Sequence, residues 1–543
     1  MDKISVNGRI ARFCAWLRTG KRDERGATAV FFAVGLLLLA PATLGLVDVY
    51  MITTQRGQLQ EALDTATLYA ARSNKMTTTD IQVVGDNALK ANLTLPEGQQ
   101  LTSSTFTLND EGKVTGHAAI TPPNIGPRLW AQGDIEANSE VLRNSNNVEV
   151  ALVLDTTGSM SSSMGDLRTA AKDLVDLVVK DEQKPYYTKV ALVPYAAGVN
   201  LGAYADAARG PTRGWTAITG VGKDGKKVVI TSVAHGLATG ERVVLYDFGS
   251  NPQLDGSRLN QEFAITRISA DQFSLDSANA DKLSGSYSGS AAKVQCLSEG
   301  CVAQRFTNAS SKTRYFGISK CASERIGSEA YSDAGPATAF VGRLYDQAVK
   351  LGSIDTSASG NKCASAEIVP LSTDRTMLKE KIEALKDAGS TAGQIGVGWG
   401  WYMVSPNWGH LWPEGSAPAD YSTRQLLKVV VLMTDGAFNS PYCKGVIAKD
   451  AGSGSGSDSD HINCDATNGN PFTQAESMCR AMKAKGVTIY TVGFNVSSDT
   501  SVQNLMRNCA TSPDYVYFPN GGTALKIAFR AIAQDINSLR ISK

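Results

Sequence analysis

Residues 148–160, VEVALVLDTTGSM, join an apolar run rich in β-branched residues to an abrupt polar end at Asp155. Such a run predicts a strand that is buried on both faces, as the strands of parallel sheets are. Its polar end then lies at the carboxyl edge of the sheet. We therefore expect the chemistry of this chain to lie in the loop that begins at Asp155.

Three oxygen-bearing side chains alternate along that loop: Asp155, Thr157 and Ser159. One carboxylate and two hydroxyls can converge on a point at the end of the strand, and hard oxygen donors suit Mg²⁺, Mn²⁺ or Ca²⁺. A cluster of Ser, Thr and Asp after a strand also caps the following helix. The motif by itself leaves both interpretations open.

Two more polar loops strengthen the metal interpretation. Residues 427–436, LKVVVLMTDG, predict a second strand that is buried on both faces and ends at Asp435. Between the two strands lies AGSTAGQIGVGWGW, residues 388–401, with Thr391 before a predicted helix. Three polar loops, each next to an apolar element, could close on one ion.

This set resembles the von Willebrand factor type A domain and its metal-ion-dependent adhesion site. The matching residues are Asp155, Thr157, Ser159, Thr391 and Asp435, and Thr157 replaces the usual serine but keeps the hydroxyl. The resemblance implies an α/β, Rossmann-like fold, with a mainly parallel sheet and helices on both faces. It also implies that hydroxyls bind the metal directly, that the aspartates act largely through water, and that a partner carboxylate completes the coordination. The alternative is a degenerate site whose loops only bond to one another.

Length and composition exclude several classes of function. A chain of 543 residues predicts two to four domains. Its formal net charge of +1, without a basic patch interleaved with aromatics, argues against nucleic acid as a partner. No Ser/His/Asp set, Cys/His set, phosphate loop or pair of glutamates accompanies the site, so we predict that the protein is not an enzyme.

The cysteines indicate an oxidising compartment. Cys14 precedes the apolar segment described next, and eight cysteines follow it: Cys296, Cys301, Cys321, Cys363, Cys443, Cys464, Cys479 and Cys509. An even number beyond a membrane segment predicts up to four disulfides. We expect Cys479 to pair with Cys509 and Cys443 with Cys464; the sequence does not give the remaining connectivity.

The N-terminus predicts a membrane anchor. A basic segment, residues 1–26, precedes 21 residues without a charge, 27–47, which is close to the roughly 20 needed to cross a bilayer as a helix. Cations before the span place the N-terminus in the cytoplasm and the rest outside. A cleaved signal peptide is the alternative, but its apolar core is usually shorter, roughly 7 to 15 residues.

Residues 24–73 resemble the N-terminal module of the TadE/G-like proteins of the tight-adherence (Tad/Flp) pilus family. The resemblance rests on Arg25, Gly26, Asp48 and the helix with Gln58, Leu59, Ala62, Asp64, Ala66, Ala70 and Ala71. Members that prepilin peptidase cleaves carry a glutamate where this chain has Phe31, so we expect the segment to stay as an anchor. TadG-like members combine this anchor with a C-terminal von Willebrand A domain, which is the order found here.

The predicted domains follow from these motifs. They are a cytoplasmic basic segment (1–26), a transmembrane helix (27–50), a TadE/G-like helix with a small α+β stalk (51–146), the first part of the A domain (147–210), an inserted β module (211–295), a cysteine-rich insertion (296–365) and the second part of the A domain (366–543). The inserted module resembles a small β module of phage tail and bacterial surface proteins. Four tryptophans after Thr391, namely Trp399, Trp401, Trp408 and Trp412, form either an adhesive surface or, as we favour, helix packing.

The sequence thus predicts a membrane-anchored, outward-facing component of Tad/Flp pilus assembly or adherence. It would cross the bacterial inner membrane once, with its C-terminal portion in the periplasm or at the cell surface. Its partner would be a protein with an acidic residue, from the pilus or the envelope, held through a divalent ion. A structural envelope protein with a vestigial metal site is the alternative.

Overall fold

The computed structural model describes residues 24–73, 75, 77–109, 112–122, 133–142, 146–287, 289–352 and 354–541. The predictions for residues 1–23, including Cys14, lie outside the described residues. The chain divides into two compact units, Met1–Arg143 and Asn144–Lys543. Each unit has its own core and is described by itself.

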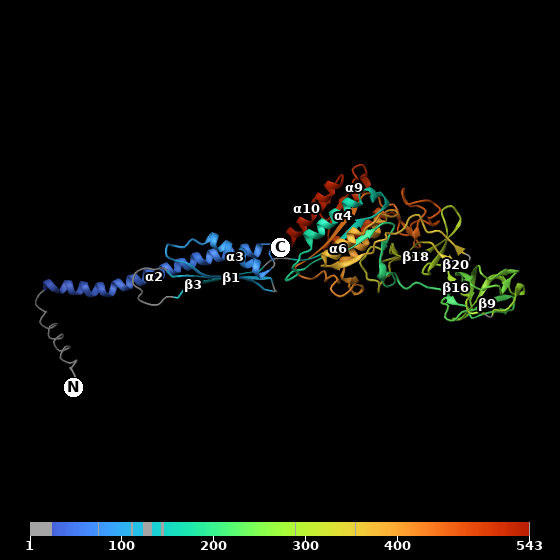
Figure 1. The fold of residues 1–543 in the computed structure, drawn as a ribbon, viewed down its shortest axis with the longest axis horizontal. Helices are drawn as coiled ribbons and strands as arrows, with labels where there is room; N and C mark the ends of the chain where they lie inside the picture. Colours follow the sequence, from blue (N-terminus) through green and yellow to red (C-terminus); the bar gives the residue numbers. More distant parts are fainter. Residues whose placement is uncertain are drawn as a thin grey trace, which may run out of the picture. The chain divides into compact units, whose positions relative to one another are not determined.

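The first unit is a helical pair on a small sheet (Figure 1). Its elements are α2 (Glu24–Arg72), α3 (Thr78–Asn92), β1 (Leu101–Leu108), β2 (Lys113–Ile120) and β3 (Ile135–Leu142), and the strands form an antiparallel sheet in the order β1-β2-β3. The second half of α2 buries Leu59, Leu63, Ala66 and Ala70, whose spacing puts them on one helical face. This stripe packs with the apolar side chains of the sheet into one core.

The first half of α2 has no such core. The large apolar side chains described there are exposed: Val30, Phe31, Phe32, Val34, Leu36, Leu37, Leu39, Leu46, Val47, Val49 and Tyr50. The helix runs without a break through residues 50 and 51, as expected of an anchor helix that continues outward. Within the part of the chain that the structure describes, no helix meets the length and hydropathy needed to cross a membrane. The side chains at positions 24–27, 38, 41 and 44 lie outside that description.

The second unit is built on a mixed sheet with a parallel centre. The strands run in the order β17-β18-β6-β5-β4-β23-β26-β27, with β19 paired to β18 and β22 paired to β5, and the pairs between β5, β4, β23, β26 and β27 are parallel. The strands are β4 (Asn147–Asp155), β5 (Thr188–Tyr195), β6 (Val199–Asn200), β17 (Ala303–Thr307), β18 (Thr313–Ser323), β19 (Gly342–Gln347), β22 (Val369–Ser372), β23 (Leu426–Thr434), β26 (Thr488–Gly493) and β27 (Val516–Tyr517).

Helices cover both faces of this sheet because its central strands are apolar on both. In β4, Ala151 and Val153 face one buried cluster, whereas Val150, Leu152 and Leu154 face another. The first cluster contains side chains of α7 (Gly393–Val404), α8 (Pro471–Ala484) and α9 (Thr500–Cys509), and the second those of α4 (Met164–Val178), α6 (Arg375–Glu383) and α10 (Gly522–Ile541). The short α5 (Ala205–Arg209) follows β6. The expected α/β class, with helices on both faces of a sheet with a parallel centre, is therefore confirmed.

An all-β module with its own core lies between α5 and β17. Its main sheet has the order β7-β16-β10-β13-β14-β9-β8, and a smaller sheet has the order β12-β11-β15. The strands are β7 (Thr216–Ala217), β8 (Gly220–Asp224), β9 (Lys227–Thr231), β10 (Arg242–Tyr246), β11 (Gln253–Leu254), β12 (Ser257–Arg258), β13 (Glu262–Arg267), β14 (Gln272–Asn279), β15 (Leu283–Ser284) and β16 (Lys293–Cys296). Its first and last strands pair antiparallel, with Thr216 opposite Val294.

Four disulfides fasten the second unit, and both predicted pairs are confirmed. Cys479–Cys509 joins α8 to α9, and Cys443–Cys464 closes the loop that carries β24 (Tyr442–Cys443) and β25 (Val446–Ile447). The two pairs that the sequence left open are Cys296–Cys301 and Cys321–Cys363. The second of these holds the segment that contains β18, β19, β20 (Lys350–Leu351) and β21 (Ile354–Asp355).

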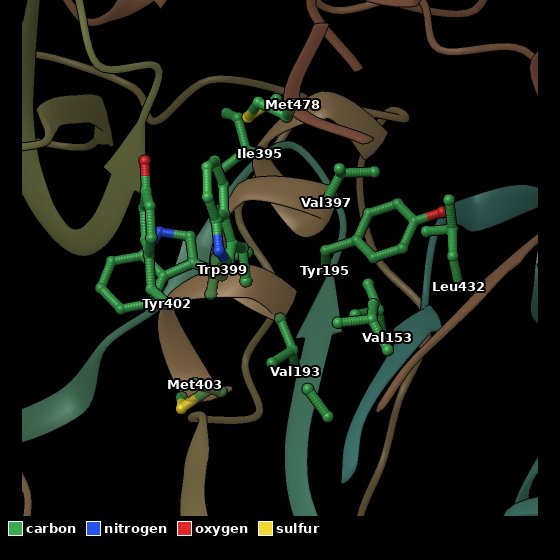
Figure 2. Packing of buried hydrophobic residues seen from close by; sticks show 14 of the residues in the cluster. Val153, Val193, Tyr195, Ile395, Val397, Trp399, Tyr402, Met403, Leu432 and Met478 are labelled. Carbon is green, nitrogen blue, oxygen red and sulfur yellow. The ribbon is translucent and has the colours of Figure 1, made fainter. Parts of the chain in front are cut away.

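The tryptophan cluster belongs to the core. Trp399, Trp401, Trp408 and Trp412 are all at least 94 % buried. Trp408 meets Trp399 edge to face, with ring centroids 5.2 Å apart, and stacks on Tyr402 at 4.3 Å. Figure 2 shows Trp399 and Tyr402 projecting from α7 among other buried side chains. This confirms that the tryptophans pack helices and do not form a surface.

Candidate metal centre

The predicted site lies where two neighbouring parallel strands end. β4 and β23 run side by side in register, with Val153 opposite Leu432. Both strands therefore end at the same edge of the sheet. β4 ends at Asp155, and β23 ends at Thr434, just before Asp435. This is the edge at which open α/β sheets bind their ligands.

Four of the five predicted residues form one continuous series of close oxygen–oxygen contacts. The Thr157 hydroxyl donates to Asp155 Oδ1 at 2.6 Å, and the Thr157 N–H donates to the same oxygen at 2.9 Å. Thr157 Oγ1 lies 2.9 Å from Ser159 Oγ, which donates to Asp435 Oδ1 at 2.7 Å. The two carboxylates are thus linked by two hydroxyls across segments that lie far apart in sequence.

The loop of the fifth residue, Thr391, is tied to both of the other loops through the backbone. On one side, Gly158 N donates to Gly389 O at 3.0 Å and Ala388 N donates to Thr156 O at 2.8 Å. On the other side, Thr391 N donates to Asn439 Oδ1 at 3.0 Å, and Asn439 N donates to Thr391 O at 2.9 Å. These contacts bring the Thr391 backbone to the site, while its hydroxyl takes no part in the series of contacts described above.

The site concentrates negative charge in a poorly solvated place. Asp155 is fully buried, and burial raises the pKa of its carboxyl even though it accepts several hydrogen bonds. Burial, together with the charge of Asp155, raises the pKa of Asp435 to about 7. Both carboxylates are therefore costly to ionise as they stand. A cation between them would offset that cost.

The donor set fits a hard divalent cation of the Mg²⁺ type. Among the described residues no three His, Cys, Asp or Glu side chains gather into a metal cluster, so any ion here would depend on hydroxyls beside two carboxylates. Asp155 Oδ2 already accepts from Tyr195 and Thr434, and Oδ1 accepts twice from Thr157. This leaves Asp155 best placed to act through a neighbouring hydroxyl or water. Ser159 is exposed and Asp435 half-buried, so this end of the series of contacts is open to solvent.

Sequence reasoning missed the residues that hold the site from behind. Tyr195 donates to Asp155 Oδ2 at 3.0 Å, and Thr434 Oγ1 donates to the same oxygen at 2.8 Å. Asn439 joins the loop after Asp435 to the loop of Thr391. The sequence did hold one signal for Tyr195: it ends the apolar run of β5, and adjacent parallel strands that end together bring their last residues side by side.

The fold and this group of residues define the class: an α/β domain with a parallel-centred sheet and an oxygen-rich loop cluster at its carboxyl edge. No family model matches the chain, and no curated protein matches it. Among solved structures, the von Willebrand domain of the type V pili tip protein Mfa5 from Porphyromonas gingivalis is 11% identical, with a TM-score of 0.32, covering 74% of this chain and 97% of that one.

Two further solved structures are adhesive pilus proteins. The adhesive tip pilin GBS104 from Group B Streptococcus agalactiae is 10% identical, with a TM-score of 0.31, covering 72% of this chain and 99% of that one. The pilus adhesin RrgA from Streptococcus pneumoniae is 11% identical, with a TM-score of 0.30, covering 82% of this chain and 49% of that one. Similarity at this level carries no argument about what this chain binds.

Proposed function

We propose that the second unit binds a divalent cation of the Mg²⁺, Mn²⁺ or Ca²⁺ type, and that this ion captures a carboxylate of a partner protein. Thr157, Ser159 and Asp435 would hold the ion, with Asp155 and Thr391 acting behind them. The observation that carries the proposal is the close grouping of oxygens from two carboxylates and two hydroxyls at the open edge of the sheet. The ion would supply charge and an open coordination position.

The electrostatics support an ion at this place. Burial raises the pKa of both carboxyls, so a bound cation would stabilise their ionised forms. The two hydroxyls beside them would complete an oxygen ligand set.

We further propose that residues 27–47 anchor the protein in the bacterial inner membrane and that the second unit faces outward, as a component of Tad/Flp pilus assembly or adherence. The sequence resemblance of residues 24–73 supports the pilus system. The exposed apolar side chains along the first half of α2 support burial in lipid, and four disulfides support an oxidising compartment.

The metal is tested by titrating the purified full-length chain with Mg²⁺, Mn²⁺ and Ca²⁺ in a calorimeter. We expect saturable binding that Asp435→Asn reduces at least tenfold, because this change removes a charge and keeps the shape of the side chain. Asp255→Asn is the control, since Asp255 is an exposed aspartate of the β module that pairs with Lys282. Equal affinities of D435N and the unchanged protein would remove the metal from this site.

The partner is tested by recovering envelope proteins on the immobilised chain in Mg²⁺ and in EDTA. Capture through the ion predicts that the same proteins are lost in EDTA and with D435N. If the same envelope proteins are recovered in EDTA and with D435N, the result would favour the alternative, a structural envelope protein with a vestigial site.

A further inference from the structure

Tyr195 lies behind the candidate metal centre and contacts Asp155 together with residues that neighbour the other site residues. It is the last residue of β5, stands opposite Asp155 in the parallel register and is fully buried. Its hydroxyl lies 3.0 Å from Asp155 Oδ2 and 3.0 Å from Met433 O, two residues before Asp435. One phenol group therefore joins the ends of β4 and β23.

The backbone of Tyr195 makes a second link. Its carbonyl oxygen accepts from both the N–H and the hydroxyl of Thr156, each at 2.9 Å, which fixes the chain between Asp155 and Thr157. The carbonyl of the next residue, Ala196, accepts from Ala392 N at 2.9 Å. Ala392 follows Thr391 directly, so the end of β5 also holds the third loop.

The ring of Tyr195 makes a third link, to α7 and to the loop after Asp435. A Cβ atom added at Gly396 would lie 2.7 Å from the ring, so α7 can approach this closely only because position 396 is glycine. The ring also meets Phe438 edge to face, with centroids 6.5 Å apart. Figure 2 shows the Tyr195 ring among buried side chains of the sheet, with residues of α7 close by.

We propose that Tyr195 is the positioning residue of the metal centre, an inference that rests on the proposed function. By donating to Oδ2, Tyr195 and Thr434 turn the other oxygen of Asp155 toward Thr157. Without the phenol hydroxyl, Oδ2 keeps only the hydrogen bond from Thr434, so the carboxylate would be held less firmly. Groups that orient metal ligands in this way are worth about 10–100-fold in metal affinity.

The test is Tyr195→Phe in the full-length chain, with the Mn²⁺ dissociation constant measured by calorimetry. We expect the constant to rise about tenfold. Tyr490→Phe is the matched control: Tyr490 also donates its hydroxyl to an aspartate, Asp535 at 2.5 Å, but between β26 and α10. Both variants lose one Tyr–Asp hydrogen bond, so the midpoint temperature of thermal unfolding in EDTA should fall by a similar amount in both. Only Y195F should change the Mn²⁺ dissociation constant.

A second variant tests the same role of Tyr195 without removing its hydroxyl. Gly396→Ala keeps the Tyr195 hydroxyl but pushes the ring away from α7, and we expect it also to weaken Mn²⁺ binding. If the unchanged protein binds Mn²⁺ and both Y195F and G396A bind within twofold of it, Tyr195 does not position the site. If the unchanged protein binds no divalent ion, the proposed function fails first, so the two failures are distinguishable.

Discussion

Glu324 shows how a single buried acid can join distant parts of the second unit. It follows β18 and is 6 % exposed. Its Oε1 accepts from Gln394 of α7 at 2.8 Å and from Gln474 of α8 at 3.1 Å, and Asn468 donates to Oε2 at 3.3 Å. Burial outweighs these bonds and raises the pKa of Glu324 to about 7.

This pKa makes stability depend on pH in a predictable direction. The unfolded chain releases the Glu324 proton near its ordinary pKa of 4.5, whereas the folded protein keeps it to about pH 7. The folded state thus binds more protons between these values, and the free energy of unfolding falls as pH rises, by on the order of 3 kcal/mol. Glu324→Gln cannot titrate, so we expect a smaller fall between pH 5 and pH 8 in urea unfolding. Glu414 is exposed, so the free energy of unfolding of Glu414→Gln should depend on pH as that of the unchanged protein does. If the free energy of E324Q also had the same pH dependence as the unchanged protein, Glu324 would not be the titrating group.

At the scale of residues, the sequence revealed the groups that end strands and not the groups that support them. Asp155 and Asp435 stand out because an apolar run stops at or just before each. Thr434 resembles an ordinary strand residue in the sequence, and although Tyr195 ends the run of β5, only the register of β4, β5 and β23 brings their hydroxyls to Asp155. Whether the predicted site holds a metal stays a prediction.

Among the elements, α7 is the one fitted most tightly to the sheet. Every residue from Gly393 to Val404 is buried, and glycines recur where the helix crosses other side chains. A Cβ at Gly393 would lie 2.0 Å from the Phe438 ring, and one at Gly400 would lie 2.6 Å from Val153. The helix that follows Thr391 is therefore held at a distance that other residues would not permit.

Gly400→Ala should destabilise the protein although alanine favours helices. Its methyl group would meet Val153 and Val430, whose branched side chains have little freedom in the sheet. We expect a loss of about 1–3 kcal/mol in urea unfolding. Gly398→Ala is the control, because the nearest atom there is the flexible Met478 sulfur at 3.2 Å, and its change should stay within about 1 kcal/mol. If Gly400→Ala and Gly398→Ala changed the free energy of unfolding equally, helix propensity and not contact with the valines would determine the effect.

Elements were predictable where their periodicity is strong. The apolar runs predicted β4 and β23. Residues 296–365 show little periodicity, and there the sequence predicted only a cysteine-rich insertion. In the structure, β17, β18 and β19 of this segment extend the central sheet. Residues 296–365 are held by disulfides and by pairing at the edge of the sheet, and neither kind of contact leaves a regular pattern in the sequence.

At the scale of the whole molecule, two compact units with separate cores make ion binding a local event. An ion bound only by the folded second unit should stabilise that unit and leave the first unchanged. In differential scanning calorimetry, Mg²⁺ at one hundred times its dissociation constant should stabilise one transition by about 2.7 kcal/mol. EDTA should reverse the shift and D435N should abolish it. A second-unit transition that Mg²⁺ leaves unchanged would contradict ion binding by that unit.

The sequence indicated an apolar N-terminal helix, a small α+β region and an interrupted α/β domain, because these differ in composition and periodicity. The apolar helix was expected to continue outward past residue 50, and α2 is continuous there, since no Gly, Pro or capping pattern ends the helix at that point. The membrane span itself stays a proposal.

The antiparallel pairing of β7 with β16 has a consequence for how this protein can change over generations. Because the β module starts and finishes on neighbouring strands, the chain enters and leaves it at nearby points. A change in the length of the module would therefore leave the distance that the chain must span between α5 and β17 the same.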